Sequence, residues 1–410
     1  MTAARINADR LWQRLMALAE IGDTGDGGVN RQALTAGEID AWRLLLRWGA
    51  ESGLEASTDA AANLFLTLRG RERTNAPALI GSHVDTQPTG GKFDGAFGVL
   101  AALEVVTTMA ERGVVPARDV TVVAWCNEEG SRFAPGMTGS EAFAGVRGMV
   151  AIRAIRDSTR VSVGEAIDTL HAAFPDLPRR PLGFTPAFYI EPHIEQATLL
   201  EKAGVPIGIV TGIQGKITWE ITIAGEEGHA GTLVMALRRD ALASFARMAS
   251  AMQAQVGDAD PIVKFTIGMI RVSPNAPSVV PGRVVFRIDL RHPDNAALQA
   301  HGARVESIAR NLAAPCDVTV TRLVDAPSNA FDAGLEQRIA ATATRLGYAS
   351  MPLLSAAGHD SRYMAPLCPS AMIFVPCRDG VSHSPLEWAE PEDLAAGAAV
   401  LAEMVAELTA

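Results

Sequence analysis

The stretch ALIGSHVD, residues 78–85, decides the fold, because an apolar run leads directly into polar residues. The same transition occurs in VTVVAWCNEEG, residues 120–130, and the segment between them, residues 99–112, has apolar residues at helical spacing. Two short apolar runs separated by a helix predict a strand–helix–strand unit of an α/β domain. Because crevices form at the carboxyl ends of such strands, we expect the polar residues after each run to contribute to a functional site.

Length and composition restrict the class of protein. A chain of 410 residues is too long for one ordinary core, which favours two domains. Its formal net charge of -10 argues against nucleic acid or anionic lipid as a partner. No run reaches the roughly 18 apolar residues of a membrane span, and the N-terminal region lacks the apolar core of a signal peptide. We therefore expect a cytoplasmic protein without a membrane partner, acting on a small molecule.

The pattern of expected elements divides the chain. Leucines at helical spacing predict a helix over residues 6–21 and a closing helix from Pro391. Between these two helices lies a middle segment rich in expected strands. In that segment we expect strands near 207–210, 214–223, 262–272 and 283–290, and a helix over about 234–256. We predict a discontinuous catalytic domain, 1–210 and 327–410, and an inserted α+β domain, 211–326.

Three motifs carry groups suited to a two-metal hydrolytic centre. His83 and Asp85 are two residues apart in an extended segment, so their side chains point to the same face. Asp85 could therefore orient a metal-bound imidazole. Asp94 lies among glycines, where a carboxylate can turn inward to bridge two cations, although a turn aspartate has the same surroundings. Glu128 and Glu129 follow a buried strand, and a solvated acidic loop is the alternative. If they are buried, one can bind a metal and the other can take a proton from water.

Other polar residues lie in glycine-flanked or strand-end motifs. His193 follows an apolar stretch, and His229 lies in a turn of the inserted segment, where it could polarise a carbonyl oxygen as an oxyanion hole does. Arg291 ends a predicted strand and could bind a carboxylate in bidentate fashion, although an ion pair with Asp289 is an alternative. A lone histidine is more often structural, so the prediction of a functional site depends on all of these residues together.

Taken together, the motifs resemble those of the M20 metallopeptidase-like amidohydrolases, in particular the group of N-carbamoyl-L-amino acid hydrolases, allantoate amidohydrolases and β-ureidopropionases. The segments that carry the resemblance are GKFDG (91–95), EEGSRF (128–133), HIEQ (193–196), GHAGT (228–232), RRDA (238–241) and SHSP (382–385). The resemblance implies an α/β fold, with a di-metal aminopeptidase-like catalytic domain whose mixed sheet is flanked by helices. It also implies an inserted α+β domain that serves as lid and dimerisation domain, with hinges near 208–212 and 325–330.

The resemblance also implies roles for individual residues. Two divalent metal ions, zinc, manganese, cobalt or nickel, would be bound by His83, Asp94, Glu129, His193 and His383, with Asp94 bridging. Glu128 would be the general base. Substrate would contact Gln196, Arg291, Gly358 and His359. His229 would reach the active site of the neighbouring subunit, which implies a homodimer formed through the inserted domain.

Two departures from the family pattern concern the substrate. Ser278 stands where the family usually has an asparagine that helps to hold substrate, and it offers a different set of donors. Ala197 and Thr198 replace the glycine and proline that usually follow HIEQ. The metal ligands are complete, whereas the substrate pocket differs from the commonest form.

We therefore predict a metal-dependent amidohydrolase that cleaves a linear, non-peptide C–N bond of a small carboxylate-bearing substrate. The substrate most consistent with the motifs is an N-carbamoyl-L-amino acid, attacked by metal-bound hydroxide. Alternatives on the same scaffold are allantoate or another ureido acid, an N-acyl amino acid and a xenobiotic amide. His193, where peptidase relatives have a carboxylate, argues against a peptidase, and the unpaired Glu128 argues against a non-catalytic binding protein.

Overall fold

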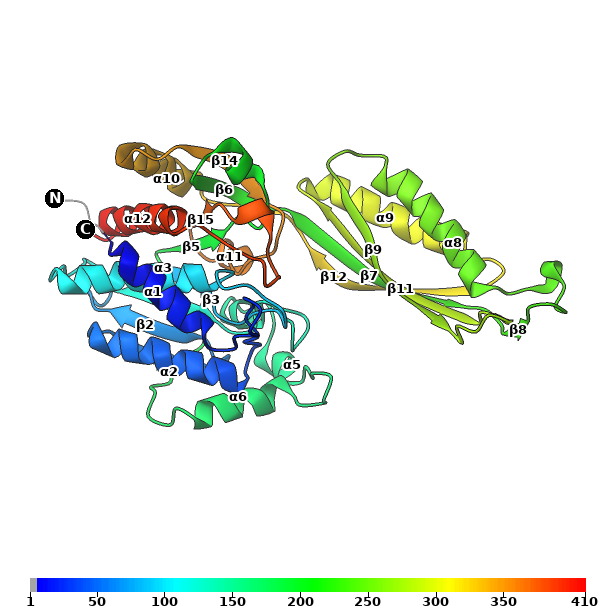
Figure 1. Cartoon of the computed structure of the whole chain (residues 1–410), viewed down its shortest axis with the longest axis horizontal. Helices are drawn as coiled ribbons and strands as arrows, with labels where there is room; N and C mark the ends of the chain where they lie inside the picture. The colour runs from blue at the N-terminus through cyan, green and yellow to red at the C-terminus, as the bar shows by residue number, and fades with distance from the viewer. Residues whose placement is uncertain (1–5) are drawn as a thin grey trace. The chain divides into compact units, whose positions relative to one another are not determined.

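The computed structural model describes residues 6–410, and the chain forms two compact units (Figure 1). Unit 1 combines the segment that ends at Gly212 with the segment that begins at Ala330, and unit 2 is the insertion Ile213–Asn329. Within the described residues no helix is long and apolar enough to span a membrane. The cytoplasmic location and the lid role of the insertion stay predictions.

Unit 1 is built on a nine-stranded mixed sheet. Its strands are β1 (Glu55–Thr58), β2 (Leu64–Leu68), β3 (Ala78–His83), β4 (Val120–Trp125), β5 (Phe188–Ile194), β6 (Ile207–Ile213), β13 (Asn329–Ala330), β14 (Ser350–Ser355) and β15 (Ser370–Val375). They follow the order β1-β2-β4-β3-β5-β15-β6-β13, with β14 paired to β6. The central strands β4, β3, β5 and β15 are parallel to one another, while β1, β2 and β6 pair antiparallel with their neighbours.

Helices cover both faces of this sheet. They are α1 (Ala8–Ala19), α2 (Ala36–Glu51), α3 (Ala96–Glu111), α4 (Thr138–Phe143), α5 (Met149–Arg153), α6 (Val163–Ala172), α7 (Leu199–Ala203), α10 (Ala333–Leu346), α11 (Ser361–Met364) and α12 (Pro391–Leu408). Successive strand residues point to opposite faces. Ile80 and Val122 therefore join a core with α1, α3 and α12, whereas Leu79 and Val123 join one with α4 and α11. The mixed sheet between helical layers confirms the predicted fold class.

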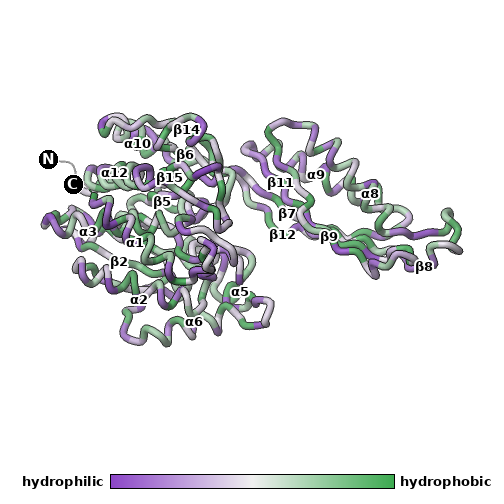
Figure 2. Tube along the Cα trace, in the orientation of Figure 1, coloured by the Kyte–Doolittle hydropathy of each residue, from purple (hydrophilic) through white to green (hydrophobic). Residues whose placement is uncertain are grey.

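Unit 2 is an α+β structure with a single core. Strands β7 (Gly215–Ala224), β9 (Lys264–Ser273), β11 (Arg283–His292) and β12 (Asp317–Ala326) form an antiparallel sheet in the order β12-β7-β11-β9. Buried residues alternate along β7 and β11, and they pack against α8 (Ala241–Met252) and α9 (Asn295–Asn311). The mixture of hydrophobic and hydrophilic residues along these strands is visible in Figure 2. A separate ribbon pairs β8 (Gly228–His229) with β10 (Val279–Val280).

The helix expected over 234–256 is interrupted. A 3-10 turn, Met235–Leu237, comes first, and α8 begins only at Ala241. The carboxylate of Asp240 accepts hydrogen bonds from the backbone N–H groups of Leu242 and Ala243, in the first turn of α8, at 2.9 Å each. Because this cap satisfies amides that a continuous helix would bond internally, the helix begins after Asp240.

Candidate metal centre

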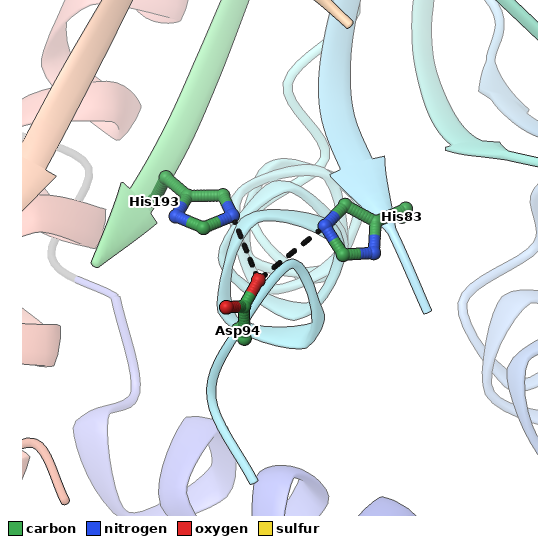
Figure 3. Close-up of side chains that lie close together, drawn as sticks. All are labelled: His83, Asp94 and His193. Atoms are coloured by element: carbon green, nitrogen blue, oxygen red, sulfur yellow. Dashed lines mark ion pairs between the residues drawn. The ribbon is translucent and has the colours of Figure 1, made fainter. Parts of the chain in front are cut away.

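Asp94 lies at the centre of a buried group of histidines (Figure 3). His83 is the last residue of β3, His193 lies near the end of β5, and Asp94 immediately precedes the cap of α3. The Nε2 atoms of His193 and His83 lie 3.2 and 3.5 Å from the same atom, Oδ1 of Asp94. His83 and His193, which lie 110 positions apart in the sequence, therefore converge on one carboxylate oxygen.

The fold explains this convergence. β3 and β5 are parallel neighbours, so their carboxyl ends meet at one edge of the sheet. Between Asp94 and α3, Gly95 has φ 62°, and a Cβ at that position would lie only 2.3 Å from the imidazole of His83. Glycine is needed here both for the left-handed backbone and for the close approach of the ring.

The other oxygen of Asp94 belongs to a second group of ligands. Nε2 of His383 lies 3.3 Å from Oδ2 of Asp94 and 3.3 Å from Oε2 of Glu129. Two possible metal-binding triads result, His83–Asp94–His193 and Asp94–Glu129–His383. Because Asp94 presents a different oxygen to each triad, its carboxylate has the arrangement required of a bridge between two cations.

The hydrogen bonds of the buried histidines set their tautomers. Nδ1 of His83 lies 3.0 Å from the carbonyl oxygen of Asp85, and Nδ1 of His193 lies 2.9 Å from that of Ile194. A carbonyl oxygen only accepts, so each Nδ1 carries the proton of the neutral ring and each Nε2 is unprotonated. Nε2 of His83 faces Asp94, and Nε2 of His193 lies beside Asp94 and also accepts from the backbone N–H of Gly95 at 3.1 Å. Lone pairs that face a carboxylate oxygen repel it unless a cation lies between them. Burial lowers the pKa of His193, but Asp94 outweighs burial and the net pKa is raised, so a positive charge is favoured here.

Asp85 fixes the loop that carries the paired glutamates. Its two carboxylate oxygens accept hydrogen bonds from the backbone N–H groups of Glu128 and Glu129, each at 3.1 Å. The same carboxylate lies 3.6 Å from Nδ1 of His83, whose hydrogen bond goes instead to the backbone carbonyl of Asp85. The side chain of Asp85 thus holds the acidic loop, while its main chain orients the imidazole.

Glu128 is buried, and Glu129 is partly buried with a side chain only 5% exposed, unlike residues of a solvated acidic loop. Glu128 is 8% exposed, and its Oε2 lies 3.6 Å from Nε2 of His83. Burial raises the pKa of Glu128 well above its usual value and raises that of Glu129 to about 7. A carboxylate with a raised pKa accepts a proton readily, which suits Glu128 to the predicted role of base.

The residues of unit 1 that we predicted to contact substrate lie close to the ligands. The side-chain amide of Gln196 donates to Oδ2 of Asp94 at 2.6 Å, as does the hydroxyl of Ser382. The ring of His359 packs edge-on against that of His193, with centroids 4.6 Å apart, and burial lowers the pKa of His359 well below its usual value. A Cβ on Gly358 would lie 3.2 Å from the side chain of Met137. Substrate contact by these residues stays a prediction.

In unit 2, His229 and Ser278 share one structural element. Ser278 directly precedes β10, the strand that pairs with β8 and His229. Nδ1 of His229 accepts hydrogen bonds from the backbone N–H groups of Gly231 and Thr232, at 3.0 and 3.2 Å. The remaining proton of the neutral ring therefore sits on Nε2, and the side chain is exposed. His229 thus presents an N–H donor, as stabilisation of an oxyanion would require.

Arg291 forms the ion pair considered in the sequence analysis. Its Nε lies 2.8 Å from Oδ1 of Asp289, and Lys216 lies 3.1 Å from the other oxygen of the same carboxylate. Binding of a substrate carboxylate by Arg291 stays a prediction.

Glu387 is a residue of this centre that sequence reasoning missed. Its Oε1 accepts hydrogen bonds from the backbone N–H groups of Phe93 and Asp94, at 2.8 and 3.1 Å. A Cβ on Gly91 would lie 2.0 Å from the carboxylate carbon of Glu387, so the glycine makes room for it. The only sequence signal is its place four residues after His383, which does not reveal a contact with Asp94.

A buried carboxylate shared by two ligand triads, with a further glutamate beside it, is typical of metal-dependent hydrolases. The model of the peptidase family M20/M25/M40 matches residues 79–407, and the chain belongs to this family. This membership confirms both the resemblance predicted from the motifs and the prediction of a hydrolytic enzyme.

Several relatives are similar to the chain over nearly its whole length. The N-carbamoyl-L-amino-acid amidohydrolase of Rhizobium meliloti is 39% identical over 98% of this chain and 97% of its own. The corresponding enzyme of Geobacillus stearothermophilus is 41% identical, covering 98% and 99%. The allantoate amidohydrolase of Escherichia coli (strain K12) is 34% identical, covering 95% of each chain.

Solved structures are also similar to the chain over nearly its whole length. A hydantoinase/carbamoylase family amidase from Burkholderia vietnamiensis has a TM-score of 0.91 and 38% identity, covering 100% of this chain and 99% of that one. Aminopeptidase PepT from Bacillus cereus shares the fold, with a TM-score of 0.70 and 17% identity over 99% of this chain and 100% of that one.

Proposed function

We propose that the chain is a metal-dependent amidohydrolase that converts N-carbamoyl-L-amino acids and water into the amino acid, ammonia and carbon dioxide. The observation that carries the proposal is the carboxylate of Asp94, whose two oxygens face separate ligand triads beside the buried Glu128. The names of the relatives from Rhizobium meliloti and Geobacillus stearothermophilus support this substrate class.

In this proposal the two triads hold two divalent ions. The donor set contains only nitrogen and oxygen, which suits zinc, manganese, cobalt or nickel. Such ions polarise a bound carbonyl and lower the pKa of water to about 7. The unprotonated Nε2 atoms of His83 and His193, both beside the shared Asp94, fit this role.

The side chains then have separate tasks. Glu128 takes a proton from the attacking water and delivers it to the leaving nitrogen. The Nε2–H of His229 donates to the developing oxyanion. Arg291 exchanges its pairing with Asp289 for the carboxylate of the substrate, since a guanidinium binds a carboxylate through two parallel hydrogen bonds.

A homodimer formed through unit 2, with His229 serving the neighbouring subunit, is part of the same proposal. In support, β9 is an edge strand of the unit 2 sheet, and its Ile270 is 45% exposed. An exposed apolar edge strand is suited to pairing with a second chain. Sedimentation at several concentrations would test the dimer, and a purely monomeric enzyme with full activity would contradict it.

A second candidate is an enzyme for allantoate, another ureido acid, an N-acyl amino acid or a xenobiotic amide. Ser278 favours it, because the family's usual asparagine has a different set of donors and acceptors. The relative named allantoate amidohydrolase shows that the same scaffold serves another ureido substrate.

A substrate panel distinguishes these candidates. Metal-reconstituted protein is assayed with N-carbamoyl-L-amino acids, their D-enantiomers, allantoate and N-acetyl amino acids. The release of both ammonia and acetate is measured. Ammonia from N-carbamoyl-L-amino acids supports the proposal. Ammonia from allantoate alone, or acetate from the N-acetyl compounds alone, supports the second candidate.

A further inference from the structure

Glu191 is a fully buried carboxylate without a task in the mechanism above. It lies on β5, two residues before His193, and both of its oxygens are hydrogen-bonded. Oε1 accepts from the hydroxyl of Ser82 at 2.8 Å, while Oε2 accepts from the backbone N–H and the hydroxyl of Ser361, at 2.9 and 2.6 Å. One side chain thus joins β3, β5 and the start of α11.

The bond to Ser82 lies where the sheet itself no longer links the two ligand strands. Backbone pairing between β3 and β5 ends at Ile80 and Ile190. The two histidines lie three residues beyond that point, on strand ends without a direct ladder between them. Because Ser82 directly precedes His83, its bond to Glu191 replaces the missing ladder next to both ligands.

The bond to Ser361 reaches the segment that we expect to face the substrate. Ser361 follows His359 by two residues, and the ring of His359 packs on His193 with centroids 4.6 Å apart. Since Glu191 and His193 lie on the same strand, the two hydrogen bonds from Ser361 hold the His359 segment at a set distance from the metal ligand. A buried carboxylate needs such bonds, because its desolvation is otherwise unfavourable.

We propose that Glu191 is a positioning residue that holds the ligands His83 and His193 and the His359 segment in one hydrogen-bonded frame. Its hydrogen bond to Ser82, here called the Ser82 arm, sets the geometry of metal binding. Its hydrogen bonds to Ser361, the Ser361 arm, set the geometry of substrate binding. The second arm rests on the proposed function, whereas the first depends only on the metal site.

Separate variants test the two arms. Zn²⁺ affinity is measured by competition with a chromophoric chelator, and KM and kcat are measured for N-carbamoyl-L-amino acids. Ser82→Ala is expected to weaken Zn²⁺ binding about tenfold with KM within about twofold of wild type, as for other groups that orient metal ligands. Ser361→Ala is expected to raise KM about fivefold without a change in Zn²⁺ affinity, the effect of one lost hydrogen bond.

Glu191 itself is tested with two substitutions. Glu191→Ala removes both arms and is expected to weaken Zn²⁺ binding about 100-fold. Glu191→Gln keeps the frame, because its carbonyl accepts from Ser361 and its amide donates to Ser82, so it stays within about threefold of wild type. The control is Ser370→Ala, which removes a buried hydroxyl of β15 bonded to the carbonyl of Cys368, outside this network.

The outcomes are decisive in either direction. If Ser82→Ala and Ser361→Ala lower Tm as Ser370→Ala does but leave Zn²⁺ affinity and KM unchanged, Glu191 is merely structural and the proposal is overturned. Equal losses in Glu191→Gln and Glu191→Ala would assign the effect to charge and also overturn it. Should Glu191→Ala not fold, Ser82→Ala and Glu191→Gln still decide. A protein that turns over no ureido substrate contradicts the proposed function, while the Zn²⁺ measurements test the frame independently.

Discussion

Unit 1 and unit 2 hold their candidate functional residues in different ways. In unit 1 His83, Asp94 and His193 are buried, and hydrogen bonds fix both the position and the tautomer of the two histidines. In unit 2 His229 is exposed, and Arg291 is partly exposed and paired with Asp289. If the proposed roles are right, the candidate groups of unit 1 are prearranged for the reaction, whereas Arg291 of unit 2 would exchange its present partner for the substrate.

The largest difference between the units is expected for Asp94→Ala compared with His229→Ala. Removal of the shared carboxylate eliminates a ligand of both triads, so metal content and turnover should fall together, with kcat lowered about 10³-fold or more. His229→Ala should lower kcat but retain the metal. Metal analysis of the purified variants checks this, and normal metal content in Asp94→Ala would remove Asp94 from the bridging position.

Next in size is the effect of Glu128→Gln. Glutamine keeps the volume of the side chain but has no basic oxygen, so we expect kcat to fall about 10³-fold while metal content stays at the wild-type level. Metal analysis and steady-state kinetics on one preparation measure both. Full activity of this variant would exclude Glu128 as the base.

A pair of glycine substitutions compares the packing of the units. Gly91→Ala places a Cβ where the carboxylate of Glu387 lies, so we expect a loss of about 2 kcal/mol in stability together with weaker metal binding. In β9, a Cβ on Gly268 would meet only the side chain of Thr266, at 3.9 Å. Gly268→Ala should therefore leave Tm unchanged or slightly raised. Thermal unfolding with and without metal measures both, and equal behaviour of the two variants would refute the contrast.

The smallest effect is expected on substrate affinity. Arg291→Ala should raise KM about tenfold with little change in kcat, because it removes uniform binding of a carboxylate. The matched control is Arg287→Ala on the same strand, where the exposed arginine pairs with the partly exposed Glu220. An unchanged KM in Arg291→Ala would exclude Arg291 from binding the substrate carboxylate.

The candidate metal ligands were predicted from the resemblance of the motifs to a family, and the places of some of them also follow from local rules. His83 is the last residue of the apolar strand β3 and Glu129 lies in the loop that follows β4, and parallel strands end at one edge of the sheet. The Asp94 loop was predicted from its glycines. These residues need no knowledge of distant packing beyond the order of the strands.

The supporting carboxylates could not be predicted in this way. Glu387 contacts the backbone of Asp94 across 293 positions, and Glu191 contacts Ser361 across 170. Such contacts depend on how the loops pack in three dimensions. The break before α8 was missed for another reason. The apolar spacing continues through the segment, and the carboxylate of Asp240 interrupts the helix by capping the start of α8.

A metal titration of metal-stripped protein, with bound metal and ammonia release from an N-carbamoyl-L-amino acid followed together, tests the proposed metal centre and its reaction at once. The protein is expected to bind two Mn²⁺ or Zn²⁺ ions per chain, and ammonia release is expected to rise with occupancy and to be lost again with a chelator. Ammonia release that is unaffected by stripping, or a protein that binds no metal, would contradict this proposal.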